Sequence, residues 1–348
     1  EPFETNGGRE FSYDAYLAKD GIFSIIQNAH IEQVAPRAGV FTHIRGALSD
    51  FKYAGLSALT KGLPEPHASL AGGLILGGKQ GLGKELLNDF ITVGLVHIVV
   101  LSGYNVMIVA QFILILFGLL SKKWAPLAAG LTIAAFVLAA GAGPASIRAG
   151  IMAGIGLYAR ATDRTYEAFR ALIFTGILML VWNPLTLAFD PGFQLSFIAT
   201  LGLIFGVPLI EPKLSLVPWR WLREVIATTI AAQIAVLPLL LYENGLLSLV
   251  ALPANILVLP LVPLAMLLSA IAGVAGFVLP SFAPVLAFPA SLLLSYFTSV
   301  VESAASVPLA ALSIPDFPFI LVVIAYALLG YFLFRSHTSY RISKNIKR

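Results

Sequence analysis

From about residue 85 to residue 334 the chain alternates between long apolar runs and short polar breaks. Nine of these runs approach the ~20 residues with which an α-helix crosses a bilayer. The predicted spans are 103–120, 124–142, 144–160, 168–182, 193–210, 224–242, 261–278, 284–303 and 317–334. The pattern therefore predicts an all-α polytopic membrane protein with a transmembrane domain over residues 85–334 and a basic tail over 335–348.

Two further apolar stretches, 91–101 and 246–260, are too short or too broken to read as ordinary spans. Backbone at membrane depth must be buried in protein or line a wet cavity. We therefore predict that both stretches are interfacial or re-entrant elements beside the spans.

Polar residues dominate only the first 36 positions. Gly21–Val34 combines β-branched residues with partial alternation, which predicts one or two strands. The stretch is too short to close a β-domain, so residues 1–36 are interpreted as the tail of an extracellular soluble module. The chain starts at Glu1 without a signal-peptide pattern, and we expect it to be part of a longer protein.

Residues 37–84 form an amphipathic or interfacial linker in this interpretation. Over 40–61 the apolar side chains, Phe51 and Leu59 among them, fall mostly on one face of a predicted helix. Such a helix lies on a membrane surface or packs against the spans. Pro64 then ends it.

The composition agrees with the hydropathy pattern. Hydrophobic residues make up 58% of the chain and charged residues 11%, whereas a soluble domain carries roughly 25% charged residues. Lipid must therefore cover much of the surface. The chain has no cysteine, which excludes disulfides, thiolate zinc sites and cysteine nucleophiles within it.

The placement of basic residues predicts the orientation, because cytoplasmic loops carry an excess of Lys and Arg. If 246–260 does not cross, the tail and three basic loops share one side, and the loops with Asp190, Glu243 and Asp316 share the other. The loop residues are Lys122, Lys123, Arg160, Arg164, Arg170, Lys213, Arg220 and Arg223, and the tail adds Arg335, Arg341, Lys344, Lys347 and Arg348. We expect a cytoplasmic C-terminus and an N-terminal region outside the cytoplasmic membrane.

Polar side chains within apolar runs are the first candidates for function in a membrane protein. The candidates for the lining of a transport path are His97, Ser102, Asn105, Arg148, Asp190, Gln194, Gln233 and Asn255. Arg148 is the strongest, because an arginine inside a span needs water, an acid or another partner. Its simpler interpretation is a side chain that reaches the outer headgroups.

The other candidates also have structural interpretations. Ser102 or Asn105 could cap a helix, and Asp190 could cap the helix that follows it. Gln194 and Gln233 could hydrogen-bond to neighbouring helices. These alternatives remain open at the level of the sequence.

The chain shows no zinc-hydrolase histidine pattern and no Walker A spacing around its glycine-rich segments. We therefore expect no metal, no cofactor and no enzymatic activity in this chain. Two other functions are weighed against a channel. A small-solute transporter would use the broken stretch near Asn255, and a membrane-embedded hydrolase or transferase would use His97 and Ser102.

Several short motifs follow one another along nearly the whole chain. They are Asn6-Gly7-Gly8 with Phe11 to Leu17, Gly94 to Val106, Pro144 with Ser146, Arg148 and Met152, Gly192 to Phe197, Gln233 with Pro238, and Asn255 with Pro260. In this order they resemble the competence domain of the ComEC family, the inner-membrane DNA channel of natural transformation. The resemblance also implies that the N-terminal remnant is OB-like.

The resemblance implies that single-stranded DNA passes into the cytosol. It further implies an extracellular DNA receptor, a cytoplasmic motor ATPase and membrane lipids as partners, and leaves open a homo-oligomer. Asn105 stands where the family motif has a second histidine, which argues against a two-histidine metal or acid–base site there. Ala145 is an extra residue before Ser146, and the chain stops before the family's metallo-β-lactamase-like domain.

Overall fold

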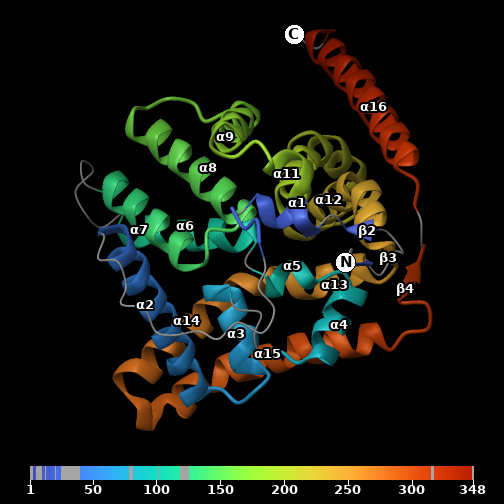
Figure 1. Cartoon of the computed structure of the whole chain (residues 1–348). Helices are drawn as coiled ribbons and strands as arrows, with labels where there is room; N and C mark the ends of the chain where they lie inside the picture. Colours follow the sequence, from blue (N-terminus) through green and yellow to red (C-terminus); the bar gives the residue numbers. More distant parts are fainter. Residues whose placement is uncertain are drawn as a thin grey trace.

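The protein is described by a computed structural model that is almost entirely helical (Figure 1). It describes residues 3–4, 10–11, 13–19, 21–24, 40–77, 81–100, 102–117, 125–314 and 317–346. Asn6-Gly7-Gly8, Lys122, Lys123 and Asp316, which entered the sequence predictions, lie outside these residues.

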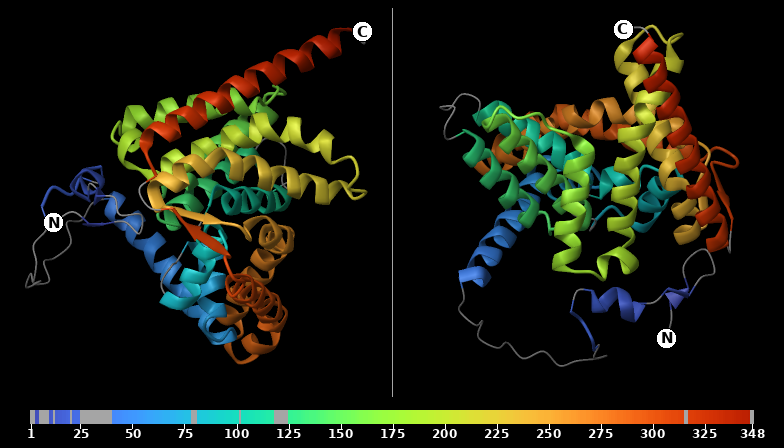
Figure 2. Two further views of the ribbon diagram at one scale, coloured as in Figure 1. Left: turned by 90° about the vertical axis from the view of Figure 1, so that its right-hand side faces the viewer. Right: turned by 90° about the horizontal axis from the view of Figure 1, so that it is seen from above.

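The N-terminal segment lies to one side of the helical body (Figure 2). Its two short strands, β1 (Phe3–Glu4) and β2 (Glu10–Phe11), pair antiparallel and precede α1 (Tyr13–Ala18). Residues 21–24 form a turn and irregular chain rather than the start of the predicted strand. The rest of that prediction, 25–34, falls outside the described residues.

A helix forms at each of the nine predicted spans. They are α6 (Gly103–Phe117), α7 (Ala125–Ala139), α8 (Pro144–Ala161), α9 (Ala168–Trp182), α11 (Pro191–Ile210), α12 (Arg220–Asn244), α14 (Val262–Val278), α15 (Ala283–Ala305) and α16 (Phe319–Ile346). Continuous helical stretches that are long and apolar enough to cross a membrane are Pro191–Leu214, Arg220–Asn244, Ala251–Val278 and Pro280–Ala305. The structure therefore confirms an all-α membrane protein, and the count of nine spans stays a prediction.

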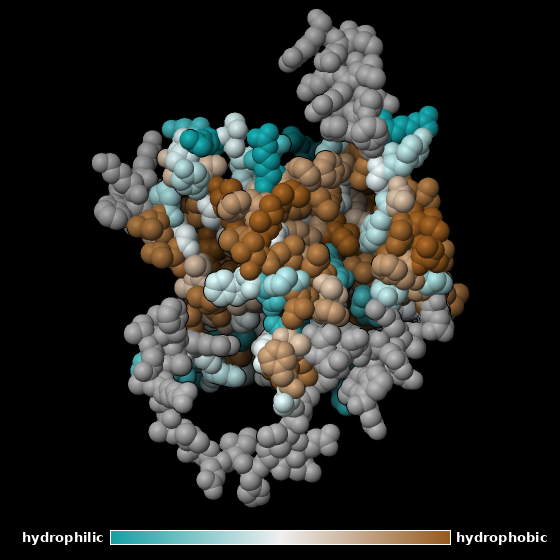
Figure 3. All heavy atoms as spheres, turned by 45° about the horizontal axis from the view of Figure 1, so that its top comes forward, coloured by the Kyte–Doolittle hydropathy of each residue, from teal (hydrophilic) through white to brown (hydrophobic). Residues whose placement is uncertain are grey.

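Apolar side chains gather in a broad band on the face shown in Figure 3, with hydrophilic residues along the band's upper edge. Leu131, Ile177 and Phe288 are among the large hydrophobic side chains that remain exposed in the isolated chain. Exposed apolar surface of this extent requires lipid or a protein partner.

The linker region is helical and packs on the spans. It comprises α2 (Val40–Gly62), α3 (His67–Leu76), α4 (Lys84–Thr92) and α5 (Val96–Val99). Gly276 of α14 lies against the backbone of Ala58 in α2, where a Cβ atom would not fit. Leu59 is completely buried, whereas Phe51 is 66% exposed, so the expected apolar face is only partly buried.

The stretch 246–260 differs from the single interfacial element that its apolarity suggests. Strand β3 (Leu246–Ser248) pairs antiparallel with β4 (Ala311–Ser313). Helix α13 (Ala251–Val258) then continues through the 3-10 turn Leu259–Leu261 into α14. The second part of the stretch thus belongs to the following span, which leaves the predicted number of crossings unchanged.

Helices α11 and α12 form a close hairpin through small residues. A Cβ atom added at Gly202 would lie 2.8 Å from the carbonyl oxygen of Ala231. A Cβ atom added at Gly206 would lie 3.0 Å from the Cβ atom of Ala231. Small residues four positions apart allow two membrane helices to approach closely, because no side chain separates the backbones. This hairpin holds α11 in place beside α8 and α9.

Candidate functional site

The first turns of α6, α8 and α11 meet at one place in the fold. A Cβ atom built on Gly103 of α6 would lie 3.5 Å from the carbonyl oxygen of Ala145 in α8. A Cβ atom on Gly192 of α11 would lie 3.8 Å from Cγ of Pro144. Each helix N-terminus carries a partial positive charge, so this convergence favours anions.

The guanidinium group of Arg148 links two of these helices. Its Nε donates a hydrogen bond to Oγ of Ser196 in α11 at 2.6 Å, and Nη1 lies 3.5 Å from the sulfur of Met152. The group also lies against Gly103, where an added Cβ atom would displace the tip of the Arg148 side chain. Arg148 is half-buried and is bonded to a neighbouring helix, which argues against a simple headgroup anchor.

Tyr166, in the loop between α8 and α9, is close enough to Arg148 for the two to interact electrostatically. Burial raises the pKa of the Tyr166 phenol, and the positive charge of Arg148 lowers it by a smaller amount. The phenol therefore stays neutral at physiological pH and leaves the charge of Arg148 uncancelled.

Within the described part of the chain, no carboxylate forms an ion pair with Arg148. The ion pairs there join Lys19 to Asp190, Arg170 to Glu167 and Arg220 to Glu224. An arginine held by a hydroxyl group keeps its full charge, because a hydroxyl group does not neutralise it. The site is therefore cationic.

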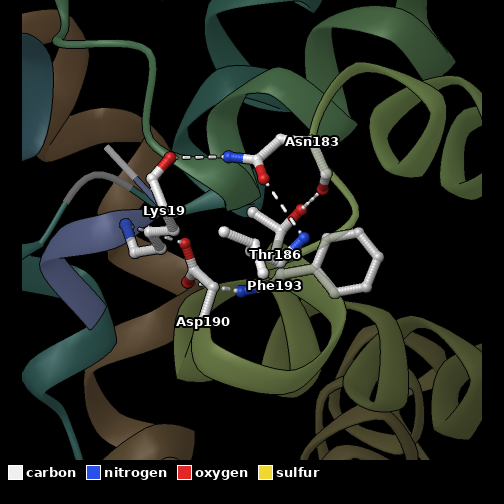
Figure 4. Close-up of polar contacts among 6 residues, drawn as sticks. Lys19, Asn183, Thr186, Asp190 and Phe193 are labelled. Carbon is white, nitrogen blue, oxygen red and sulfur yellow. Dashed lines mark hydrogen bonds and ion pairs between the residues drawn. The ribbon is translucent and has the colours of Figure 1, made fainter. Parts of the chain in front are cut away.

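Asp190 begins α11 and also contacts the N-terminal segment (Figure 4). Its Oδ1 accepts a hydrogen bond from the backbone N–H of Phe193 at 3.1 Å, which is the expected helix cap. Its Oδ2 lies 3.2 Å from Nζ of Lys19. Asn183 donates from Nδ2 to the carbonyl oxygen of Lys19 at 2.7 Å, so two polar contacts join the segment to this loop.

Gln194 holds the same loop from inside α11. Its Nε2 donates to the carbonyl oxygens of Leu187 and Ala188, at 2.8 and 3.1 Å. Both acceptors belong to the short helix α10 (Thr186–Phe189). Gln194 thus bonds to the backbone of its own loop rather than to another long helix.

Ser102 and Asn105 act in the structure as a helix cap and an anchor. The Asn105 backbone N–H donates to Oγ of Ser102 at 3.4 Å, and Ser102 donates to Oδ1 of Asn105 at 3.2 Å. Asn105 is 0% exposed, and its Nδ2 donates to the carbonyl oxygens of Leu74 and Ile98. The capping interpretation is confirmed, and Asn105 belongs to the core.

His97 lies on the exposed side of α5, with Nδ1 3.2 Å from the carbonyl oxygen of Gly94. Gly94 has a φ of 77°, and a Cβ atom there would lie 3.0 Å from Cβ of Ala251. The His97 segment therefore adjoins α13. A hydrolase would need His97 to activate Ser102, but Ser102 hydrogen-bonds to Asn105 instead.

Asn255 lies buried in α13, and its Oδ1 has no hydrogen-bond partner in the described structure. Tyr104, at the start of α6, donates to the carbonyl oxygen of Leu259 at 3.4 Å, which ties α6 to the turn after α13. Gln233 is half-buried in α12, and no described contact connects it to Arg148.

The structure thus joins the motif segments around residues 94–105, 144–152 and 190–196, and it places α13 beside the first of them. Sequence reasoning missed Ser196, Tyr166, Lys19 and Asn183. Ser196 stood within a quoted motif and could have been found there. The other three carry no sequence signal, because they belong to polar segments without periodicity.

These features define the class of the protein, an all-α polytopic membrane protein with a cationic polar site at converging helix ends. Comparison with known families then identifies it more closely. The model of the Competence protein family matches residues 74–338. The chain belongs to this family, the ComEC-type competence proteins.

ComE operon protein 3 of Bacillus subtilis (strain 168) is 29% identical to the chain over 216 residues. That alignment covers 61% of this chain and 27% of the relative, so the chain spans well under half of the relative's length. No solved structure matches the chain.

Proposed function

We propose that this chain forms the membrane-spanning path by which single-stranded DNA crosses the cytoplasmic membrane during natural transformation. Family membership supports a role in DNA uptake. The observation that supports the path itself is the setting of Arg148. This charged residue lies where three helices begin, is held by Ser196 and has no carboxylate partner among the described residues.

The chemistry of the site suits a polyanion. Arginine presents planar donors that match phosphate oxygens, and helix N-termini add partial positive charge. A single arginine gives weak, repeated contacts, so each phosphate can be released as the next one arrives. Single-stranded nucleic acid often also stacks on aromatic side chains, and Tyr104 is exposed at the start of α6, beside this site.

The proposed orientation puts the site at the outer end of the path. With nine spans, an outer N-terminal region and a cytoplasmic tail, α6, α8 and α11 all begin at the outer surface. An extracellular receptor would then deliver DNA to Arg148, and a cytoplasmic motor ATPase would pull the strand inward. The chain itself needs no catalytic step in this scheme.

The test is Arg148→Ala in the full-length protein in its host, scored by transformants obtained with purified linear DNA. The matched control is Arg160→Ala, because Arg160 is an exposed arginine in the same helix. We expect Arg148→Ala to lower transformation towards the level of a gene deletion while DNA still binds at the cell surface. Arg160→Ala should transform normally.

Arg148→Lys separates charge from geometry. Lysine keeps the charge and loses the planar fork, so partial activity is expected. Normal transformation by Arg148→Ala, at a normal level of inserted protein, would remove Arg148 from the path. Normal transformation after deletion of the whole gene would overturn the proposed function.

A further inference from the structure

We propose that Lys19 is a specificity-determining residue of the DNA path, because it neutralises Asp190 at the outer end of α11. This inference rests on the proposed function and extends it to the N-terminal segment. Its basis is a pair of opposite charges from distant parts of the chain, which the sequence does not connect.

Several contacts hold Lys19. Its Nζ lies 3.2 Å from the Asp190 carboxylate and 4.5 Å from the centre of the Tyr16 ring. Its backbone carbonyl oxygen accepts a hydrogen bond from Asn183. The Lys19 side chain is only 9% exposed, so the cation is fixed in place rather than free in solvent.

Asp190 would otherwise work against the site. It is the only acid buried among the described residues, and its Oδ1 lies 3.1 Å from the Cβ position of Gly192, which also contacts Pro144. Pro144 lies one helical turn before Arg148. An uncancelled carboxylate there would repel phosphate and offset the charge of Arg148.

The carboxylate gives the site something that a neutral cap would not. An asparagine would cap α11 about as well, yet it could not form an ion pair with a lysine. As an aspartate, residue 190 caps the helix and also holds the N-terminal segment through its ion pair with Lys19. The positive charge of Lys19 cancels the negative charge that the aspartate brings to the site. The pair as a whole is neutral, and Arg148 remains the net charge of the site.

The test uses the full-length protein in proteoliposomes, with four forms of the protein: wild type, Lys19→Gln, Asp190→Asn and the double variant Lys19→Gln/Asp190→Asn. Two quantities are measured, namely entry of a fluorescent single-stranded oligonucleotide under a membrane potential and the Cl⁻/K⁺ permeability ratio. Equal insertion and a monodisperse detergent profile are required of each variant.

If Lys19 acts by neutralising Asp190, the four forms of the protein should rank in a particular order of oligonucleotide entry. Lys19→Gln should lower oligonucleotide entry by about fivefold to tenfold at low salt, with a smaller loss at high salt because the charge is screened. It should also shift permeability towards K⁺. The double variant, which lacks both charges, should recover both quantities, and Asp190→Asn should not lose them.

If the Lys19–Asp190 pair only holds the N-terminal segment in place, a different ranking of the variants is expected. The double variant would then stay as low as Lys19→Gln, Asp190→Asn would also be low, and the permeability ratio would not move. That result would overturn the role of Lys19 and leave the channel standing. The same holds if the wild type admits DNA and Lys19→Gln behaves like the wild type. If the wild type passes neither DNA nor ions under the membrane potential, the proposed function fails and this inference fails with it. If it passes ions but no DNA in the absence of its motor, the permeability ratio alone decides the role of Lys19.

Discussion

Arg148 is a charged residue within a predicted membrane span, and its energetic cost requires a stabilising partner. A charged side chain costs roughly 2.5–3.5 kcal/mol at the centre of a bilayer-spanning helix on insertion scales, and this figure is an upper bound for Arg148, the fifth residue of α8. A hydrogen bond that involves a charged group returns about 1.5–3 kcal/mol. The bond to Ser196 therefore offsets much of the cost without neutralising the charge, which is the property that a phosphate-binding residue needs.

Ser196→Ala removes that hydrogen bond and tests how much it contributes to the stability of the fold. We expect the protein to lose about 1–3 kcal/mol of stability, because Arg148 loses a hydrogen-bond partner. The measurement is the thermal unfolding midpoint in detergent, with Thr132→Ala as the control, since Thr132 is exposed and bonds only to its own helix. An unchanged midpoint for Ser196→Ala would show that the bond contributes nothing to the fold.

Asn105 is a candidate path residue that the structure shows completely buried and hydrogen-bonded to two backbone carbonyl groups. Asn105→Leu would leave the carbonyl oxygens of Leu74 and Ile98 without their donor, and we expect a loss of about 1–3 kcal/mol. The comparison is Gln111→Leu, an exposed polar position on the same helix, which should be close to neutral. Equal unfolding midpoints of the two variants would contradict the anchoring role.

At the scale of elements, the helices pack through glycine contacts that hydropathy does not reveal. The α11–α12 hairpin depends on Gly202 and Gly206 against Ala231, and α2 lies against Gly276 of α14. The close approach of α11 to α12 places Ser196 and Asp190 where α8 and the N-terminal segment can reach them. Helix packing is therefore what assembles the site.

Gly202→Val tests this dependence. The added side chain would meet the backbone of Ala231, and overpacking typically costs about 1–3 kcal/mol. Gly154→Val is the matched control, because nothing lies within 4 Å of its Cβ position. We expect a lower unfolding midpoint and reduced DNA entry for Gly202→Val alone; no difference between the two variants would show that the hairpin tolerates separation.

At the scale of the whole molecule, the orientation in the membrane can be measured directly, because the chain has no cysteine. Ser306 follows α15 and Ser215 lies between α11 and α12, and both are exposed. The positive-inside rule puts Ser306 outside and Ser215 inside. In intact cells an impermeant maleimide should label Ser306→Cys, whereas Ser215→Cys should need permeabilisation.

Labelling of both positions from the same side would show that one of the intervening segments does not cross as predicted. Labelling with the two sides exchanged would invert the whole arrangement and put Arg148 at the cytoplasmic end. Either result would require a different account of how DNA meets the site.

The sequence alone determined the membrane class and the positions of the helices. Apolar runs cannot face water, and a backbone in lipid must satisfy its own hydrogen bonds, so hydropathy is enough to place helices. Helix α9 (Ala168–Trp182) begins and ends at the predicted residues. Arg148 was also recognisable, since a charge inside an apolar run is rare for an energetic reason.

Only the tertiary structure decided which polar residues meet. Arg148 and Ser196 are 48 positions apart, and Lys19 and Asp190 are further apart still. Such pairs depend on the angles and contacts between helices, which single-helix periodicity does not contain. For the same reason the sequence could not distinguish the buried anchor Asn105 from a path-lining amide, because both appear as one polar residue in an apolar run.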